Sequence, residues 1–129
     1  MKYGYTIFYV DSVEKSIQFY ENAFGFNRKF VTPEKDYGEL ISGETTIAFA
    51  SLDLGRSNLS DGFDQIDPET TIGMEMAFIT KDIENDFQKA LEAGAIKCED
   101  VKEKPWGQKV GYVKDINGIL IEICTPIKG

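Results

Sequence analysis

The side chains that most often carry out chemistry in proteins are few in this sequence, and histidine is absent from all 129 residues. The protein therefore has no histidine general base and no Ser-His or Cys-His nucleophile pair. It also has no histidine ligand for zinc, iron or copper. The two cysteines, Cys98 and Cys124, stand far apart and form no paired motif. Nothing cationic adjoins Cys124 in sequence, so we expect it to be a small buried hydrophobic residue.

Carboxylates and aromatic rings are therefore the groups left for binding or catalysis. The single tryptophan, Trp106, stands in Pro105-Trp106-Gly107-Gln108, which is typical of a turn that enters a strand. At the rim of a site its ring could stack on an aromatic or cationic ligand. Ordinary packing or a dimer contact is the alternative for this residue.

The overall charge excludes several classes of partner. There are 22 acidic and 14 basic residues, a formal net charge of −8, and the sequence pI is about 4.5. This balance does not suit nucleic acid or an anionic membrane surface. No apolar run approaches the roughly 18 residues of a membrane span, and the N-terminus lacks the apolar stretch of a signal peptide. With unpaired cysteines, these features favour a cytoplasmic protein.

Periodicity predicts a strand, a helix and three further strands in the first part of the chain. Residues 5–10 are β-branched and aromatic, as in a strand. Asp11-Ser12 offers helix-capping chemistry, an apolar stripe continues to about Ala23, and Gly25 stands where a C-cap glycine belongs. We expect the three strands at residues 26–31, 37–42 and 45–51.

The same order then recurs after a polar segment, Leu52 to Thr71, which we interpret as a long surface loop. A strand at 74–79, a helix capped by Asp82, and strands at 96–101, 109–114 and 119–124 are expected. Asn117-Gly118 is a hairpin signal between the last two strands. A shift of 70 residues aligns Ser12 with Asp82, Gln18 with Gln88 and Ala23 with Ala93.

This ordered set resembles the vicinal oxygen chelate superfamily, which includes glyoxalase I, extradiol dioxygenases, fosfomycin resistance enzymes and bleomycin-binding proteins. The resemblance rests on residues 5–16, 19–20, 24–26, 105–108 and 112–123. It implies an α+β fold of two βαβββ modules that form a curved mixed sheet around a cavity. We expect one domain over residues 1–129, with module 1 at about 3–51, the loop at 52–71 and module 2 at about 72–127.

The resemblance also assigns the positions at which metal-using relatives place their ligands. The first-strand positions fall on Tyr5 and Glu75, and the last-strand positions fall on Ala48 and Glu122. Many relatives have histidine at the first-strand positions and glutamate at the last-strand positions, so only Glu122 keeps that pattern. Two carboxylates could hold Mg²⁺ or Ca²⁺ loosely, but they do not make a site for zinc or iron. We therefore expect no metal and no cofactor.

Strand alternation predicts which side chains line the cavity. If Tyr5 and Glu75 point inward, the small residues Thr46, Ala48 and Ala50 point inward on the fourth strand, which favours a roomy apolar pocket with a few polar groups. Hydrogen bonding of each glutamate to Tyr5, Gln108 or water, without a chemical role, is the alternative. The expected ligand-binding residues are Tyr5, Ala48, Glu75, Trp106, Tyr112 and Glu122, and Glu122 is also the candidate catalytic residue.

The leading hypothesis is a cytoplasmic, metal-independent protein that binds a small organic molecule, similar to the bleomycin-resistance branch. Its ligand would be an amphipathic compound with cationic or aromatic character. The resemblance implies a homodimer, because short members of this branch commonly dimerise. The alternative is a lyase or dioxygenase-type enzyme that uses Glu122 as a general base, with or without a weakly bound divalent metal. A third hypothesis is a cavity that has become structural filler.

Overall fold

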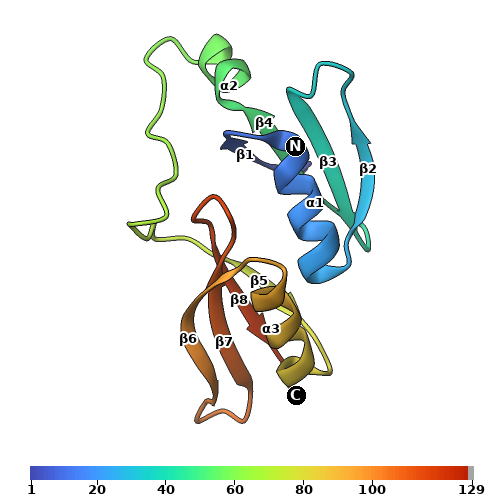
Figure 1. The fold of residues 1–129 in the computed structure, drawn as a ribbon, viewed down its shortest axis with the longest axis vertical. Coiled ribbons are helices and arrows are strands. Elements are labelled where there is room, and N and C mark those ends of the chain that lie inside the picture. The colour runs from blue at the N-terminus through green and yellow to red at the C-terminus, as the bar shows by residue number, and fades with distance from the viewer. Residues whose placement is uncertain (128–129) are drawn as a thin grey trace. The chain divides into compact units, whose positions relative to one another are not determined.

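The computed structural model of the chain describes residues 1–127 and divides into two compact units. Unit 1 is Met1–Ile66 and unit 2 is Asp67–Gly129. Each unit has one four-stranded sheet, and a long helix packs on one face of it (Figure 1). No helix among these residues is long and apolar enough to span a membrane.

Unit 1 follows the predicted order of elements and adds one short helix. The elements are β1 (Thr6–Val10), α1 (Val13–Phe24), β2 (Asn27–Val31), β3 (Tyr37–Ser42), β4 (Thr45–Ser51) and α2 (Leu52–Asn58). The strand order in the sheet is β1-β4-β3-β2. β1 runs parallel to β4, and the other two pairs are antiparallel.

The ends of α1 confirm the capping expected from the sequence. The Ser12 hydroxyl accepts a hydrogen bond from the Lys15 backbone N–H, and Gly25 ends the helix in the left-handed region at φ 71°. Glycine adopts that conformation without the steric penalty of a Cβ. The buried face of α1 packs on the sheet, where the rings of Tyr20 and Phe49 lie 5.1 Å apart. This packing forms the core of unit 1.

Unit 2 repeats the arrangement. Its elements are β5 (Met76–Ile79), α3 (Ile83–Glu92), β6 (Ile96–Glu103), β7 (Lys109–Lys114) and β8 (Leu120–Cys124), with strand order β5-β8-β7-β6. β5 is parallel to β8, and β7 is antiparallel to both β6 and β8. The α+β class and the two βαβββ modules are thus confirmed.

The prediction of one continuous loop over Leu52 to Thr71 is wrong for its first part, because Leu52–Asn58 form α2. The Ser51 hydroxyl accepts from the Leu54 N–H, and Asp53 lies in the first turn, where its charge suits the helix dipole. The signal is a capping serine at the last residue of β4. The helix has seven residues, about two turns, so no long apolar stripe marks it.

Gly55 lets α2 approach two aromatic rings very closely. A Cβ on this residue would lie 2.9 Å from both Phe63 and Tyr9, whose rings are 4.6 Å apart. We expect Gly55→Ala to lower the free energy of unfolding by about 1–2 kcal/mol, because overpacking outweighs the better helix propensity of alanine. Urea denaturation measures the change. Gly4→Ala is the control, since nothing lies within 4 Å of its added Cβ; an equal effect of both substitutions would contradict the prediction.

The hairpin expected between the last two strands is confirmed, because β7 and β8 pair as antiparallel neighbours joined by a turn. The turn spans five residues, and the buried Asp115 carboxylate organises it by accepting from the N–H groups of Asn117 and Ile119 at 2.8 and 2.9 Å. Gly118 has a φ of 99°, and a Cβ there would lie 2.7 Å from the Pro68 backbone. Close approach of the chain at Pro68 therefore explains the glycine better than a tight hairpin does.

Lys114, the last residue of β7, binds the first residues of unit 2 next to the same turn. Its buried ammonium donates to the carbonyl oxygens of Pro68 and Thr70 at 2.9 and 2.8 Å. The remainder of the expected loop has no helix or strand. It is nevertheless attached to folded structure at both ends, since Gln65 also donates to the Asp11 carboxylate in unit 1.

Candidate functional site

Each sheet has one face against its helix and one that points away from it, which we call the far face. In β1, Phe8 and Val10 are buried, whereas Ile7, the residue before Phe8, is exposed and Tyr9 is half-buried. Burial thus alternates along β1, as in a strand with one face against a core. Tyr5 and Glu75 lie one residue before β1 and β5, so both strands begin slightly later than expected. The predicted site positions on the strands fall on the far faces.

Glu122 lies on the far face of unit 2, at the centre of three strands. Its register partners are Ala77 on β5 and Tyr112 on β7. The Tyr112 hydroxyl donates to Glu122 Oε1 at 2.9 Å, and both side chains are half-buried. This places a carboxylate and a phenol, both named from the sequence, in direct contact.

Glu75 is the second carboxyl group of this cluster. Although the residue is exposed at the start of β5, three causes raise the pKa of its carboxyl group. They are burial of that group, the charge of Glu122 and a hydrogen bond to Glu122, in decreasing order. The charge of Glu122 thus disfavours the charged form of the neighbouring Glu75 carboxyl group. The structure thus brings Glu75, Tyr112 and Glu122 together.

The raised Glu75 pKa makes the stability of the protein depend on pH. The folded state favours the protonated carboxyl group, so Glu75 contributes stability below its ordinary pKa of 4.5 and loses that contribution as the pH rises through the raised value. We expect Glu75→Gln, which stays neutral, to gain stability relative to the wild type over this rise. Urea denaturation at a series of pH values tests this expectation. A stability difference that does not change with pH would contradict it.

The phenol and the thiol beside Glu122 stay protonated at neutral pH. The hydrogen bond to Glu122, burial and the negative charges raise the pKa of Tyr112 to about 12. Burial and the neighbouring Glu122 raise the pKa of Cys124 to about 11. Cys124 is buried and not in a disulfide, as predicted. Neither group is a nucleophile in this state.

Trp106 is connected to this cluster through Gln108. The Trp106 indole N–H donates to Gln108 Oε1 at 2.8 Å, and Gln108 Nε2 donates to the Thr125 carbonyl oxygen at 2.9 Å. The Gln108 side chain also interacts with the Cys124 thiol, two residues along β8 from Glu122. Because Trp106 is 62% exposed, it is not a core residue. Its indole ring is fixed at one end and open to solvent.

Unit 1 has no carboxylate at the position that corresponds to Glu122. Ala48 occupies it, fully buried, with Ile7 and Glu39 as its register partners. A carboxylate is present instead at the neighbouring position on β3, Glu39, the cross-strand partner of Ala48. Glu39 Oε2 accepts a hydrogen bond from the Tyr37 hydroxyl at 2.6 Å. Lys29 forms an ion pair with Glu39 Oε1 at 3.5 Å, and the Glu39 side chain is only 12% exposed.

A carboxylate–phenol pair therefore occurs on the far face of each unit, but on different strands. In unit 2 the carboxylate belongs to β8 and the phenol to β7, whereas in unit 1 both groups come from β3. Burial and the Glu39 carboxylate raise the Tyr37 pKa, and the Tyr5 phenol adds to the shift. Tyr5 thus lies near the Tyr37–Glu39 pair. Sequence reasoning missed Glu39, although alternation along residues 37–42 places it on the far face with Tyr37.

The residues at the family's metal-ligand positions do not fit a metal. Ala48 has no donor atom, and Tyr5 offers a phenol, which is a poor ligand while protonated. Within residues 1–127, no three Cys, Asp or Glu side chains come close enough to hold an ion. Glu122 already accepts a hydrogen bond from Tyr112. We therefore derive no chemistry through a metal.

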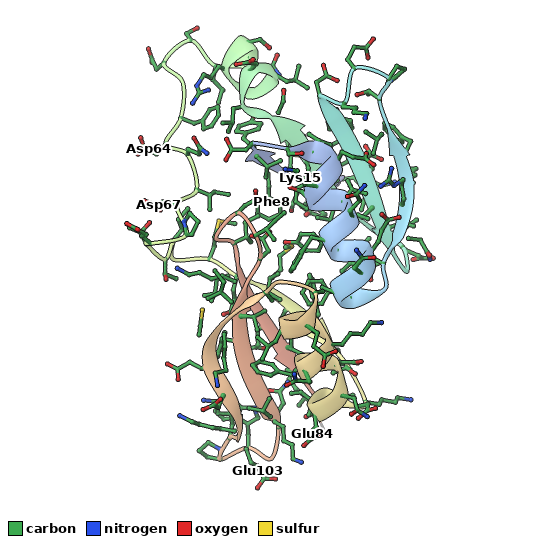
Figure 2. All side chains as sticks on the ribbon, in the orientation of Figure 1. Phe8, Lys15, Asp64, Asp67, Glu84 and Glu103 are labelled. Atoms are coloured by element: carbon green, nitrogen blue, oxygen red, sulfur yellow. The ribbon has the colours of Figure 1, made fainter. Side chains whose placement is uncertain are left out.

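A separate, open pocket of about 360 Å³ lies at one end of unit 2. Figure 2 labels two of its lining residues, Glu84 on α3 and Glu103 at the end of β6. The ion pair between Lys109 and Glu84, at 2.9 Å, belongs to its wall. The pocket includes none of the site residues predicted from the sequence, and two of its charged side chains, Lys109 and Glu84, are paired with each other.

Two βαβββ units in one chain are the arrangement of a known protein family, which comparison with family models identifies. Residues 3–128 match the model of the glyoxalase-like domain. The chain belongs to this family, and thereby to the glyoxalase/bleomycin resistance/dioxygenase superfamily that the sequence resembles. No curated protein matches the sequence significantly.

Solved structures with the same fold support the assignment. A glyoxalase-related enzyme from Fulvimarina pelagi has a TM-score of 0.82 at 16% identity, over 98% of this chain and 89% of that one. A glyoxalase/bleomycin resistance protein/dioxygenase family enzyme from Burkholderia phytofirmans has the same score and identity, over 95% and 96%. A superfamily member from Sphaerobacter thermophilus has a TM-score of 0.70 at 22% identity, over 98% of both chains. At these identities the likeness establishes the fold alone.

Proposed function

We propose that this protein is a cytoplasmic, metal-independent binding protein for a small amphipathic organic molecule that carries a cationic or hydrogen-bond-donating group. The observation that carries the proposal is the pair of carboxyl groups, Glu75 and Glu122, on the far face of unit 2. The charged neighbour that acts on Glu75 is the Glu122 carboxylate, which raises the Glu75 pKa. The two groups therefore form a negatively charged cluster. The exposed, unpaired thiol of Cys98 is compatible with a reducing compartment.

A protonated amine suits this cluster on electrostatic grounds. A partly desolvated carboxylate gains most from a cationic hydrogen-bond donor, because charge-assisted hydrogen bonds are about twice as strong as neutral ones. An ammonium group bound beside Glu75 and Glu122 would also relieve the repulsion between the two carboxylates. The exposed Trp106 ring offers an apolar or cation–π contact to the rest of the ligand.

Binding is favoured over the enzymatic alternative by what surrounds Glu122. A lyase or dioxygenase needs a group that stabilises the negative charge developing on the substrate, in addition to a general base. The neighbours of Glu122 described above are a carboxyl group, a phenol and a thiol, and the phenol already donates to Glu122. None of these groups is cationic, so the cluster suits a cation better than a developing anion.

A pair of probe compounds of equal size tests the proposal. 2-Phenylethylamine is cationic at neutral pH, and 2-phenylethanol is its neutral counterpart. At a concentration tenfold above its Kd the amine stabilises the fold by about 1.4 kcal/mol, which raises Tm by roughly 4 °C. We expect this saturable shift with the amine, a smaller shift with the alcohol, and a reduced shift in Trp106→Ala. Equal shifts with both compounds, or none with either, would contradict the proposed charge preference.

Metal analysis of the purified protein tests the metal-independent part separately. We expect less than stoichiometric zinc, iron or nickel after gentle purification. Binding of the amine should also be unchanged after treatment with a chelator. A stoichiometric transition metal, or loss of amine binding on chelation, would overturn this part of the proposal.

A further inference from the structure

The neutral hydrogen-bond donors around Glu122 on the far face of unit 2 are already engaged by acceptors within the protein. The Tyr112 hydroxyl donates to Glu122 Oε1 at 2.9 Å, and the Cys124 thiol is also hydrogen-bonded to Glu122. The Trp106 indole N–H donates to Gln108 Oε1 at 2.8 Å. A phenol, a thiol and an indole have one donor proton each. These three side chains therefore have no proton left for a bound molecule.

Gln108 is the residue that engages the indole, and its amide group is held in one orientation. Its Nε2 donates to the Thr125 carbonyl oxygen at 2.9 Å. The indole can only donate and the carbonyl can only accept, so these two partners determine which end of the amide faces which. The Gln108 side chain is buried, with 8% of the residue exposed. Its oxygen is thus kept on the indole N–H.

The backbone of Trp106 is held as firmly as its ring. In the turn between β6 and β7, the Gly107 N–H donates to the Lys104 carbonyl oxygen at 2.8 Å, and the Lys104 N–H donates to the Gln108 carbonyl oxygen at 2.7 Å. Gly107 completes the turn with a φ of 90°. Trp106 is 62% exposed although its N–H is bonded. It therefore offers ring carbons to a ligand and no hydrogen bond.

The ammonium group on the neighbouring part of β7 does not supply the missing donor. Lys114 lies two residues beyond Tyr112 and so on the same face of the strand. Its side chain is buried and its ammonium group donates to the carbonyl oxygens of Pro68 and Thr70. The cluster thus presents the carboxyl groups of Glu75 and Glu122 together with the Trp106 ring.

We propose that Gln108 sets the specificity of this site by occupying the Trp106 indole N–H, so that the site selects amines whose other end is apolar. This inference rests on the proposed binding function and narrows its ligand class. A ligand that brings an acceptor against Trp106 loses water and finds no donor there, which weakens binding roughly tenfold. Because Gln108 acts through Trp106, it is a positioning residue.

Two derivatives of 2-phenylethylamine with nearly the same shape test the proposal. The para-acetyl derivative has a carbonyl oxygen at the end remote from the amine, and the para-isopropyl derivative has none. Isothermal titration calorimetry gives the ratio of the acetyl Kd to the isopropyl Kd. In Gln108→Leu the indole N–H is free to donate to the carbonyl oxygen, so we expect this ratio to fall about fivefold to tenfold, as one new hydrogen bond predicts. An unchanged ratio in the folded variant would overturn the inference.

Gln88→Leu is the matched control, because it makes the same substitution on α3, on the other face of the sheet. Gln88 is exposed and donates to Glu92 Oε1 at 3.4 Å. The ratio of the two Kd values should equal that of the wild type. A fall as large as in Gln108→Leu would overturn the role of Gln108.

Two further measurements keep the test decisive if Gln108→Leu does not fold. Trp106→Phe keeps an aromatic ring without an N–H, so both affinities should fall together; selective loss of the acetyl derivative would show that the wild-type N–H binds ligands and overturn the inference. Trp106 is the only tryptophan, so its indole N–H gives a single NMR signal in the ligand-free protein. Exchange of this proton with solvent should be at least about tenfold slower than in free tryptophan.

The outcomes separate this inference from the proposed function on which it rests. Indole exchange as fast as in free tryptophan overturns the inference without reference to any ligand. Binding of both amines with a ratio that Gln108→Leu leaves unchanged overturns the inference alone. Absence of binding by either amine overturns the proposed function and the inference together.

Discussion

Replacing Glu122 with glutamine is expected to weaken 2-phenylethylamine binding by about 10- to 100-fold while the protein stays folded. The magnitude follows from the roughly 1.5–3 kcal/mol that a hydrogen bond to a charged group contributes. The amide keeps the shape of the side chain and an oxygen that accepts from Tyr112. It also removes the like charge beside Glu75, so the free energy of unfolding should not fall. Isothermal titration calorimetry measures the affinity, and urea denaturation measures the stability.

Glu92→Gln is the matched control for this substitution. Glu92 lies at the end of α3, the helix on the other face of the sheet, and its exposed carboxylate accepts from Gln88 Nε2 at 3.4 Å. Both variants lose one negative charge, so any effect of net charge on amine binding is the same in each. The Glu92 variant should bind as the wild type does. Equal weakening in the two variants would mean that Glu122 acts only through the overall charge of −8.

Much of the fold could be predicted because its signals are local. The N-cap at Ser12, the left-handed glycine at Gly25 and the two-residue alternation of the strands each depend on a few neighbouring residues. The repeat over 70 residues then supplied the order of elements in unit 2 from that in unit 1.

The parts that were missed depend on contacts between distant residues. α2 is too short for a periodic pattern, and Gly55 fits only because the rings of Tyr9 and Phe63 lie against it. The hairpin between β7 and β8 was predicted, but the buried carboxylate of Asp115 organises its turn, and the Asn-Gly signal does not reveal that role. Neither contact is visible in the spacing of residues along the chain.

Glu39 was missed for a different reason. The repeat aligns Ala48 of unit 1 with Glu122 of unit 2. Judged by this alignment alone, unit 1 has no carboxylate at the site position. The sheet register adds what the repeat lacks, because Glu39 is the cross-strand partner of Ala48. A carboxyl group is thus present on the far face of unit 1, on the strand next to the expected position. Candidate sites in strands are better compared by cross-strand neighbourhood than by repeat position alone.

The second large effect is expected at Asp115, which joins the fold of unit 2 to its candidate site. The carboxylate is fully buried and accepts two backbone N–H groups in the turn that sets the β7–β8 register. We expect Asp115→Ala to lower the free energy of unfolding by about 2–4 kcal/mol, because both N–H groups lose their acceptor in a buried place. Urea denaturation followed by circular dichroism measures the loss.

Asp115→Asn separates the hydrogen bonds from the charge, because its amide oxygen still accepts. Its loss of stability should be about half that of the alanine variant. The same turn holds Tyr112 opposite Glu122, so a loosened turn should also weaken the contact between the two side chains. The titration of Tyr112, followed by its absorbance, should then begin at lower pH in folded Asp115→Ala than in the wild type, where the pKa is about 12. An unchanged Tyr112 titration in a destabilised variant would show that the turn supports the fold without setting the geometry of the carboxylate–phenol pair.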